Sequence, residues 1–292
     1  MARSGTLPAG VVAAVAAAVL LNYFDRGSLA TAAPVLQQSL ALSSTQLGVL
    51  LSAFFWAYGP AQLLAGWLVH RFDVRVVLGT GVALWALATL LTGLASTFAV
   101  ILALRLVLGL GECVTYPSWQ VILSRHVPEH RRGRLTGIVA AGQGLGPMLG
   151  TLIGGLAMAR YGWRVMFLGM GGATLLWLLP WWWLARRGAI RVEREAHDTA
   201  VGYREIFRQR AFWGMALGHF AGNYPFYFVL TWLPSYLVKV GGLSLERMAV
   251  VGGLVFGAYA AATIVAGFAV DRAIERCAAR YESAYNSLIS AH

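Results

Sequence analysis

Charged residues are scarce in this chain of 292 residues. They make up 12% of it, and 58% of the residues are hydrophobic, whereas a soluble domain carries about 25% charged residues. A soluble fold of this composition would have to expose much apolar surface, so the long apolar runs favour burial in lipid. The composition therefore excludes an ordinary soluble domain and predicts an integral membrane protein.

Cysteine is nearly absent, because the chain has only Cys113 and Cys277. Two such residues form no disulfide framework and have no metal-ligand spacing. The sequence also carries no His/Asp/Glu metal cluster and no nucleophile motif. We therefore expect no metal and no cofactor, and we expect that the protein is not an enzyme.

Lysine occurs once, at Lys239, so arginine supplies nearly all of the net charge of +11. These basic residues lie in short loops between apolar runs, not on a patch interleaved with stacking aromatic residues. We therefore expect a lipid bilayer around the protein and no nucleic-acid partner. The pattern does not predict an oligomeric state.

A membrane-spanning helix needs about 20 mostly apolar residues, and the sequence predicts eight of them. The predicted spans are 9–34, 45–69, 76–95, 97–122, 134–158, 162–185, 211–238 and 247–270. The fold class is therefore an all-α membrane protein. We expect a six-helix bundle over 1–186, a cytoplasmic linker over 187–210, two helices of a second bundle over 211–270 and a polar tail over 271–292.

Arginine is distributed unequally between the two sides. With the N-terminus inside, 17 basic residues fall in cytoplasmic segments and four in outer segments. Cytoplasmic loops of membrane proteins carry such an excess. We therefore expect a cytoplasmic N-terminus.

Four ionisable residues interrupt otherwise apolar spans: Asp25, Arg26, Arg105 and Glu112. A charge near the bilayer centre costs roughly 2.5–3.5 kcal/mol on insertion scales, so it usually marks a substrate or proton pathway. Arg105 and Glu112 are seven residues apart, almost two full helical turns, and so share a helix face. We expect Asp25 to pair with Arg105, which leaves Arg26 without an acid until an anionic ligand supplies one. A carboxyl group in apolar surroundings, such as Glu112, can load and release a proton near neutral pH.

Polar side chains occur at similar depths in other spans. Amides and hydroxyls there suit a polyhydroxylated ligand, although each one singly also suits a bond between helices. They are Tyr23, Tyr58, Gln143, Asn223 and Tyr227.

Glycines recur at four-residue steps in the fifth span, at 142, 146, 150 and 154. A stripe of small residues lets another helix approach closely. It suits both a moving interface and plain tight packing.

Several motifs in combination resemble one transporter family. They are Asn22-Tyr23-Phe24-Asp25-Arg26, Ser52–Tyr58, Arg105–Glu112 with Tyr116-Pro117, Tyr161–Arg164 and Trp232–Leu237. Together they resemble the anion:cation symporter family of the major facilitator superfamily, over nearly the whole chain to about residue 272. The resemblance implies a proton-coupled carrier of a small organic anion, such as a sugar acid or another carboxylate.

The resemblance also implies roles for individual residues. Arg26 would hold the substrate carboxylate, Asp25 and Glu112 would couple protons, and Tyr23, Tyr58 and Gln143 would contact a sugar acid. The loop after the second span departs from the family pattern, because His70 stands where an Asp is usual and Asp73 where a Gly is usual. Asp73, with Arg71 and Arg75, would then form the inner gating loop.

The family has twelve helices, whereas eight are predicted here, so we expect a fragment that stops after about eight helices. Two alternatives stay open. Gly146-Pro147 partly fits the fifth helix of exporters in the same superfamily, and a truncated membrane fragment would not transport at all.

Overall fold

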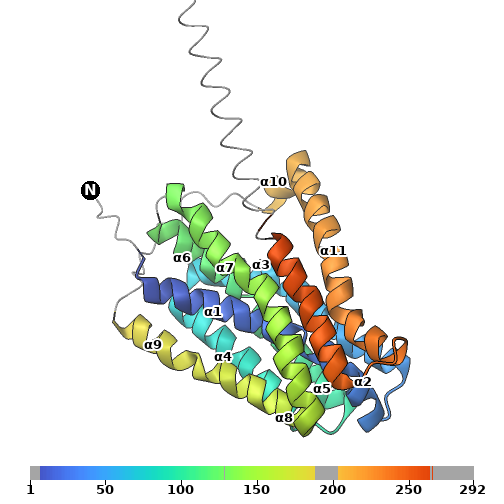
Figure 1. Ribbon diagram of the computed structural model, residues 1–292. Helices are drawn as coiled ribbons and strands as arrows, with labels where there is room; N and C mark the ends of the chain where they lie inside the picture. The colour runs from blue at the N-terminus through green and yellow to red at the C-terminus, as the bar shows by residue number, and fades with distance from the viewer. Residues whose placement is uncertain (1–6, 128, 188–202, 264, 266–292) are drawn as a thin grey trace, which may run out of the picture.

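Helices account for the regular structure throughout the part of the chain that the computed structural model describes, residues 7–127, 129–187, 203–263 and 265. Their bounds are α1 Ala9–Arg26, α2 Ser28–Ser39, α3 Ser44–Arg71, α4 Val74–Thr92, α5 Phe98–Glu112, α6 Thr115–His126, α7 Glu129–Leu149, a π-helical turn Gly150–Gly154, α8 Gly155–Leu176, α9 Leu178–Arg186, α10 Tyr203–Arg208 and α11 Arg210–Lys239. A last helix follows over Leu245–Thr263. The predicted all-α bundle is confirmed, and Figure 1 shows its long helices side by side.

Six helical stretches in the described residues are long and apolar enough to cross a membrane. One of them, Leu135–Arg186, contains two predicted spans, because the backbone turns at Gly162, where φ is 83°. Glycine adopts that conformation without steric cost. The predicted span 211–238 corresponds to α11. This helix is not among the six, because Asn223, its tyrosines and its prolines lower its hydropathy. Of the predicted linker, 188–202 lies outside the described residues, as does the whole predicted tail.

Side-chain caps fix where several helices begin. The Ser43 hydroxyl accepts from the backbone N–H of Gln46, and the Gln46 side chain accepts from the backbone N–H of Ser43. The Asp73 carboxylate accepts from the backbone N–H of Arg75 at the start of α4. Each cap satisfies a donor that the first turn of a helix leaves free.

The first three glycines of the predicted stripe are where α1 meets α7 and the π-helical turn, whereas Gly154 faces Met166 and Met170 of α8. A Cβ added at Gly142 would lie 2.9 Å from the backbone nitrogen of Leu20, and one at Gly146 would lie 2.6 Å from the Cβ of Tyr23. At Gly150 the nearest atom, 2.7 Å away, would be the carbonyl oxygen of Phe24. The two backbones therefore touch, which fixes the segment that carries Tyr23, Asp25 and Arg26.

Two of the long helices are interrupted inside the bundle. α1 ends at Arg26 and α2 resumes after Gly27, while α5 ends at Glu112 and α6 resumes at Thr115. The basic and the acidic residue thus both occupy the last position before a break.

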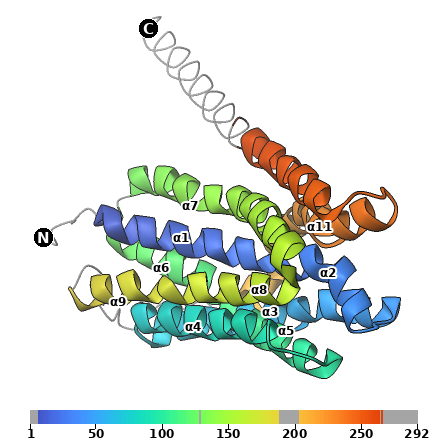
Figure 2. The ribbon, with the colours of Figure 1, turned by 60° about the horizontal axis from the view of Figure 1, so that its bottom comes forward.

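The second part of the chain packs against the first at one end. α11 lies beside α2, and the Lys239 ammonium donates to the side-chain oxygen of Gln37 there. The first half of α11 stands free of the bundle, since Trp213, Met215, Leu217 and Phe220 are exposed. Figure 2 shows α11 and the last helix together at the same end of the bundle as α2, with α1 and α7 in adjacent layers.

Candidate functional site

Arg26 lies at the centre of the bundle in a buried ion pair with Glu112. Its Nη2 and Nε lie 2.9 and 3.1 Å from Oε2 of Glu112, and both side chains are almost wholly inaccessible. Nη2 also donates to Oδ1 of Asn22 at 2.9 Å, and Nη1 to the hydroxyl of Tyr227 at 2.6 Å. Our expectation that Arg26 lacks an acid is wrong, because Glu112, at the end of α5, lies beside it.

Aromatic rings enclose the same guanidinium. Its central carbon lies 4.6 Å from the ring centres of Tyr23 and Tyr58 and 5.1 Å from that of Phe54. The electron-rich faces of such rings attract a cation, and the attraction strengthens when water is excluded. The fifth predicted span reaches the same residue, since the amide of Gln143 donates to the Tyr23 hydroxyl at 3.2 Å.

Asp25 is separate from this pair. One of its oxygens, Oδ2, accepts from Nε1 of Trp85 at 3.1 Å and from the hydroxyl of Thr174 at 3.2 Å. The other oxygen, Oδ1, is buried with no hydrogen-bond partner among the described residues. The expected ion pair with Arg105 is not formed, so neutral donors hold Asp25.

Arg105 is buried, and few polar groups compensate its positive charge. Its Nη2 lies 3.4 Å from the hydroxyl of Ser28, and its Nε has no hydrogen-bond partner within the described part of the chain. Phe167 lies against it, with the ring centre 5.9 Å from the guanidinium carbon. A buried cation in this state attracts an anion strongly.

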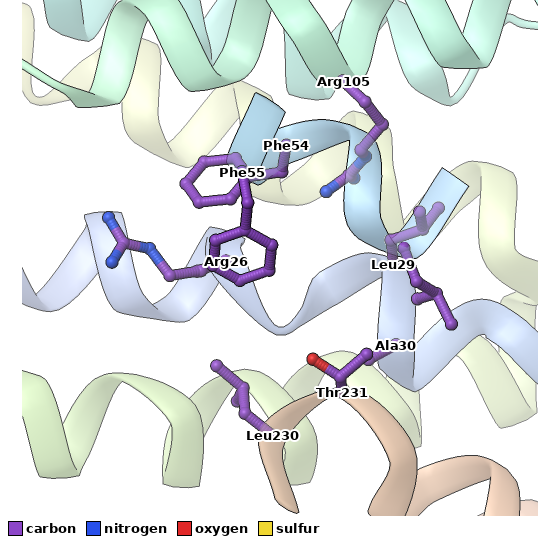
Figure 3. Close-up of a pocket in the computed structure, with 9 residues that line it drawn as sticks. Arg26, Leu29, Ala30, Phe54, Phe55, Arg105, Leu230 and Thr231 are labelled. Atoms are coloured by element: carbon purple, nitrogen blue, oxygen red, sulfur yellow. The ribbon is translucent and has the colours of Figure 1, made fainter. Parts of the chain in front are cut away.

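A narrow cavity joins the two arginines. Residues of α1, α2, α3, α5 and α11 line it, as Figure 3 shows. They are Arg26, Leu29, Ala30, Leu51, Phe54, Phe55, Arg105, Leu230 and Thr231. Most of its lining is apolar, α11 closes one wall, and the Arg26 guanidinium points away from Arg105 in Figure 3.

Asn223 lies apart from the other predicted binding residues. Its amide donates to the carbonyl oxygen of His219 on its own helix, at 2.8 Å. Tyr227, one turn further along α11, reaches Arg26 instead. The first half of α11, which includes Asn223, stands free of the bundle, and this explains the difference.

The three predicted gating residues lie at the junction of α3 and α4. Arg71 is exposed at the end of α3, while Arg75 pairs with Asp73 at 2.6 Å and donates to the carbonyl oxygen of Ala185 at 3.2 Å. Partial burial alone would raise the pKa of Asp73, but hydrogen bonds from Arg75 and its charge outweigh burial and hold that pKa below its ordinary value. Asp73 and Arg75 thus tie the loop to α9.

Sequence reasoning missed Trp85 and Thr174 as partners of Asp25. A signal was available, because a buried indole N–H or hydroxyl in an apolar helix needs an acceptor. Neither residue could be matched to Asp25 without knowing how α4 and α8 face α1.

The sequence pattern of the Major Facilitator Superfamily matches residues 15–288. The chain belongs to the Major Facilitator Superfamily. The probable L-galactonate transporter of Escherichia coli K12 is 31% identical over 270 residues, which are 87% of this chain and 59% of that protein. The probable sulfoacetate transporter of Cupriavidus necator is 29% identical, over 88% of this chain and 63% of that protein. The hexuronate transporter of Bacillus subtilis is 30% identical, over 80% of this chain and 57% of that protein.

This superfamily member thus spans about 60% of the length of the curated relatives that it matches. Among solved structures, a bacterial homologue of the lysosomal transporter Spinster in an inward-facing, unoccupied conformation matches with a TM-score of 0.75 and 22% identity, over 92% of this chain and 64% of that one. A D-xylose–proton symporter matches with a TM-score of 0.69 and 16% identity, over 90% and 69%. These structures share the fold. The names of the relatives are those of transporters, not enzymes.

Proposed function

We propose that the chain contains the anion- and proton-binding centre of a carrier that takes up a small organic anion together with a proton. One observation carries the proposal: the buried Arg26 is held by the carboxylate of Glu112 beside a cavity. A planar guanidinium grips a carboxylate through two parallel bonds. An incoming carboxylate can take the place of Glu112.

The charges of the site explain why a proton would accompany the anion. Asp25, Arg26, Arg105 and Glu112 are all buried, and together they sum to zero when ionised. A bound monoanion adds one negative charge in surroundings where an uncompensated charge is expensive. One proton on a carboxyl restores neutrality. Glu112, displaced from Arg26 by the anion, is the group that gains most from accepting it.

Polar groups around the guanidinium favour a hydroxylated anion. Tyr23 and Gln143 are bonded to each other, and the ring of Tyr58 stacks beside Arg26. Hydroxyl and amide groups can exchange bonds with sugar hydroxyls. The relatives are named as transporters of galactonate, hexuronate and sulfoacetate. These names support a sugar acid or a related organic acid as the substrate class.

The arginine asymmetry supports a cytoplasmic N-terminus, and the bacterial relatives support a bacterial inner membrane location. In that orientation the joined ends of α2 and α11 face outward, and the free first half of α11 faces the cytoplasm. Residues 1–186 form one transport half, 211–270 begin the second half, and the gating loop with Arg71, Asp73 and Arg75 lies on the cytoplasmic side.

Uptake into liposomes tests the proposal. Purified protein is reconstituted, an inward proton gradient is imposed, and entry of labelled galactonate, a hexuronate and sulfoacetate is measured with and without a protonophore. We expect at least one of these anions to bind, and we expect gradient-dependent uptake of that anion by a protein that has both transport halves. In parallel, calorimetry on the solubilised protein measures anion binding alone. Absence of binding for every carboxylate, or export of a lipophilic dye in its place, would contradict the proposal.

A further inference from the structure

Asp25 is held in a way that distinguishes its two oxygens. Trp85 on α4 and Thr174 on α8 both donate to Oδ2, at 3.1 and 3.2 Å. Oδ1 has no partner in the described part of the chain. All three side chains are completely buried, and none of them lines the cavity between the arginines.

The hydrogen bonds of the two donors favour the free oxygen as the one that is protonated. An indole N–H only donates, so Oδ2 must remain an acceptor for Trp85 whether or not the carboxyl carries a proton. A proton on Oδ2 would also force the Thr174 hydroxyl to turn from donor to acceptor. Oδ1, which faces no donor, has no such conflict.

The charged neighbours of Asp25 come from two helices. Glu112 and Arg105 on α5 interact with it electrostatically, and Arg26 follows it on α1. α4 and α8 present neutral groups, Trp85 and Thr174. α7 presents the neutral Gln143 near this part of α1 through Tyr23. A direct ion pair would keep the carboxylate charged at every working pH, whereas neutral donors stabilise it moderately.

We propose that Trp85 and Thr174 are positioning residues, which hold Oδ2 of Asp25 so that Oδ1 receives the coupled proton, and which set the pH of that step. The inference rests on the proposed function. The proton binds Oδ1 from water on one side of the membrane and leaves the same oxygen on the other, and no other bond is made or broken.

Infrared difference titration of the purified chain tests this directly. The carboxyl band of Asp25 is identified by its loss in Asp25→Asn, and its pH midpoint is then measured in Thr174→Val. A hydrogen bond to a charged group stabilises it enough that its loss should move the midpoint upward by about one pH unit. Thr174→Ser, which keeps the hydroxyl, should restore the original midpoint.

Thr89→Val is the matched control. Thr89 is a fully buried threonine on α4 whose hydroxyl has no hydrogen-bond partner among the described residues. Its replacement should leave the Asp25 midpoint in place. Trp85→Phe, which keeps an aromatic ring but removes the N–H, gives a second measurement if Thr174→Val does not fold, and should shift the midpoint in the same direction.

The possible results separate the two proposals. An unchanged Asp25 midpoint in Thr174→Val and Trp85→Phe, or an equal shift in Thr89→Val, overturns the positioning role even if anion uptake persists. A shifted midpoint in a protein that binds no carboxylate supports the positioning role and overturns the proposed function. The infrared measurement needs no transport, so neither result depends on the other.

Discussion

Replacing Arg26 by lysine is the sharpest test of the anion site. Lysine keeps the positive charge, so Glu112 keeps a compensating cation, whereas alanine would leave a buried carboxylate unpaired and confuse binding with stability. In the native site three nitrogens of Arg26 make four hydrogen bonds, to Glu112, Asn22 and Tyr227. A single ammonium nitrogen cannot span these positions or grip a carboxylate with two parallel bonds.

The expected loss follows from one missing bond. A hydrogen bond to a charged group contributes about 1.5–3 kcal/mol, which corresponds to roughly a 10- to 150-fold weaker affinity. The assay is calorimetry on the solubilised protein with the anion that binds the parent chain most tightly among galactonate, a hexuronate and sulfoacetate. Unfolding temperature without ligand is recorded for each variant.

Arg164→Lys is the matched control for this experiment. Arg164 donates to the carbonyl oxygens of Gly93 and Ala95, at 3.2 and 2.8 Å, and does not line the cavity. Its replacement should leave the affinity unchanged. An Arg26→Lys protein that is folded and binds the anion within twofold of the parent would refute the role of the guanidinium.

Three further outcomes are expected. Glu112→Gln keeps an oxygen that accepts from Arg26 but cannot exchange a proton, so accumulation driven by a proton gradient should stop while counterflow exchange of labelled anion continues; undiminished gradient-driven uptake would show that Glu112 is structural. Tyr227→Phe keeps the ring contacts with Phe55 and Phe226, whose centres lie 5.1 and 5.3 Å away, but it removes the hydroxyl that accepts from Arg26. Anion affinity should therefore change about tenfold. The control Tyr224→Phe, on the exposed side of α11, should leave the affinity unchanged. Because the pKa of Asp73 is lowered in the folded protein, its contribution to stability is present above the ordinary pKa of aspartate and is lost as pH falls through the lowered value. In chemical unfolding, the stability of Asp73→Asn should therefore depend less on pH in the acid range than the stability of the parent. Identical acid profiles of the two proteins would contradict the pairing with Arg75.

Periodic apolar runs made the helices predictable. Each predicted span corresponds to a helical segment as far as the structure describes it, with 264 and 266–270 of the eighth outside the described residues, and the turn at Gly162 falls where the sixth predicted span begins. The glycine spacing predicted a close helix contact, which the structure assigns to α1 and α7. These features depend on local sequence, where composition and spacing carry the information.

The pairing of charges depended on more than depth. Counting residues along helices placed Asp25 near Arg105, but it did not give the rotation of α5 relative to α1 or the interruption after Glu112. The structure therefore pairs Arg26 with Glu112. Asn223 lies apart from the other predicted binding residues for a related reason, because the point at which α11 leaves the bundle is set by packing between the two parts of the chain.

The backbone contact between α1 and α7 has a mechanical consequence. Side chains can yield by changing rotamer, but two main chains in direct contact at glycines have nothing left to compress. The two helices should therefore move as one rigid body, in which the distances between Tyr23, Arg26 and Gln143 stay constant. Motion that opens a path for cargo must then occur elsewhere, for example where side chains of α11 meet α1, as Phe226 meets Tyr23.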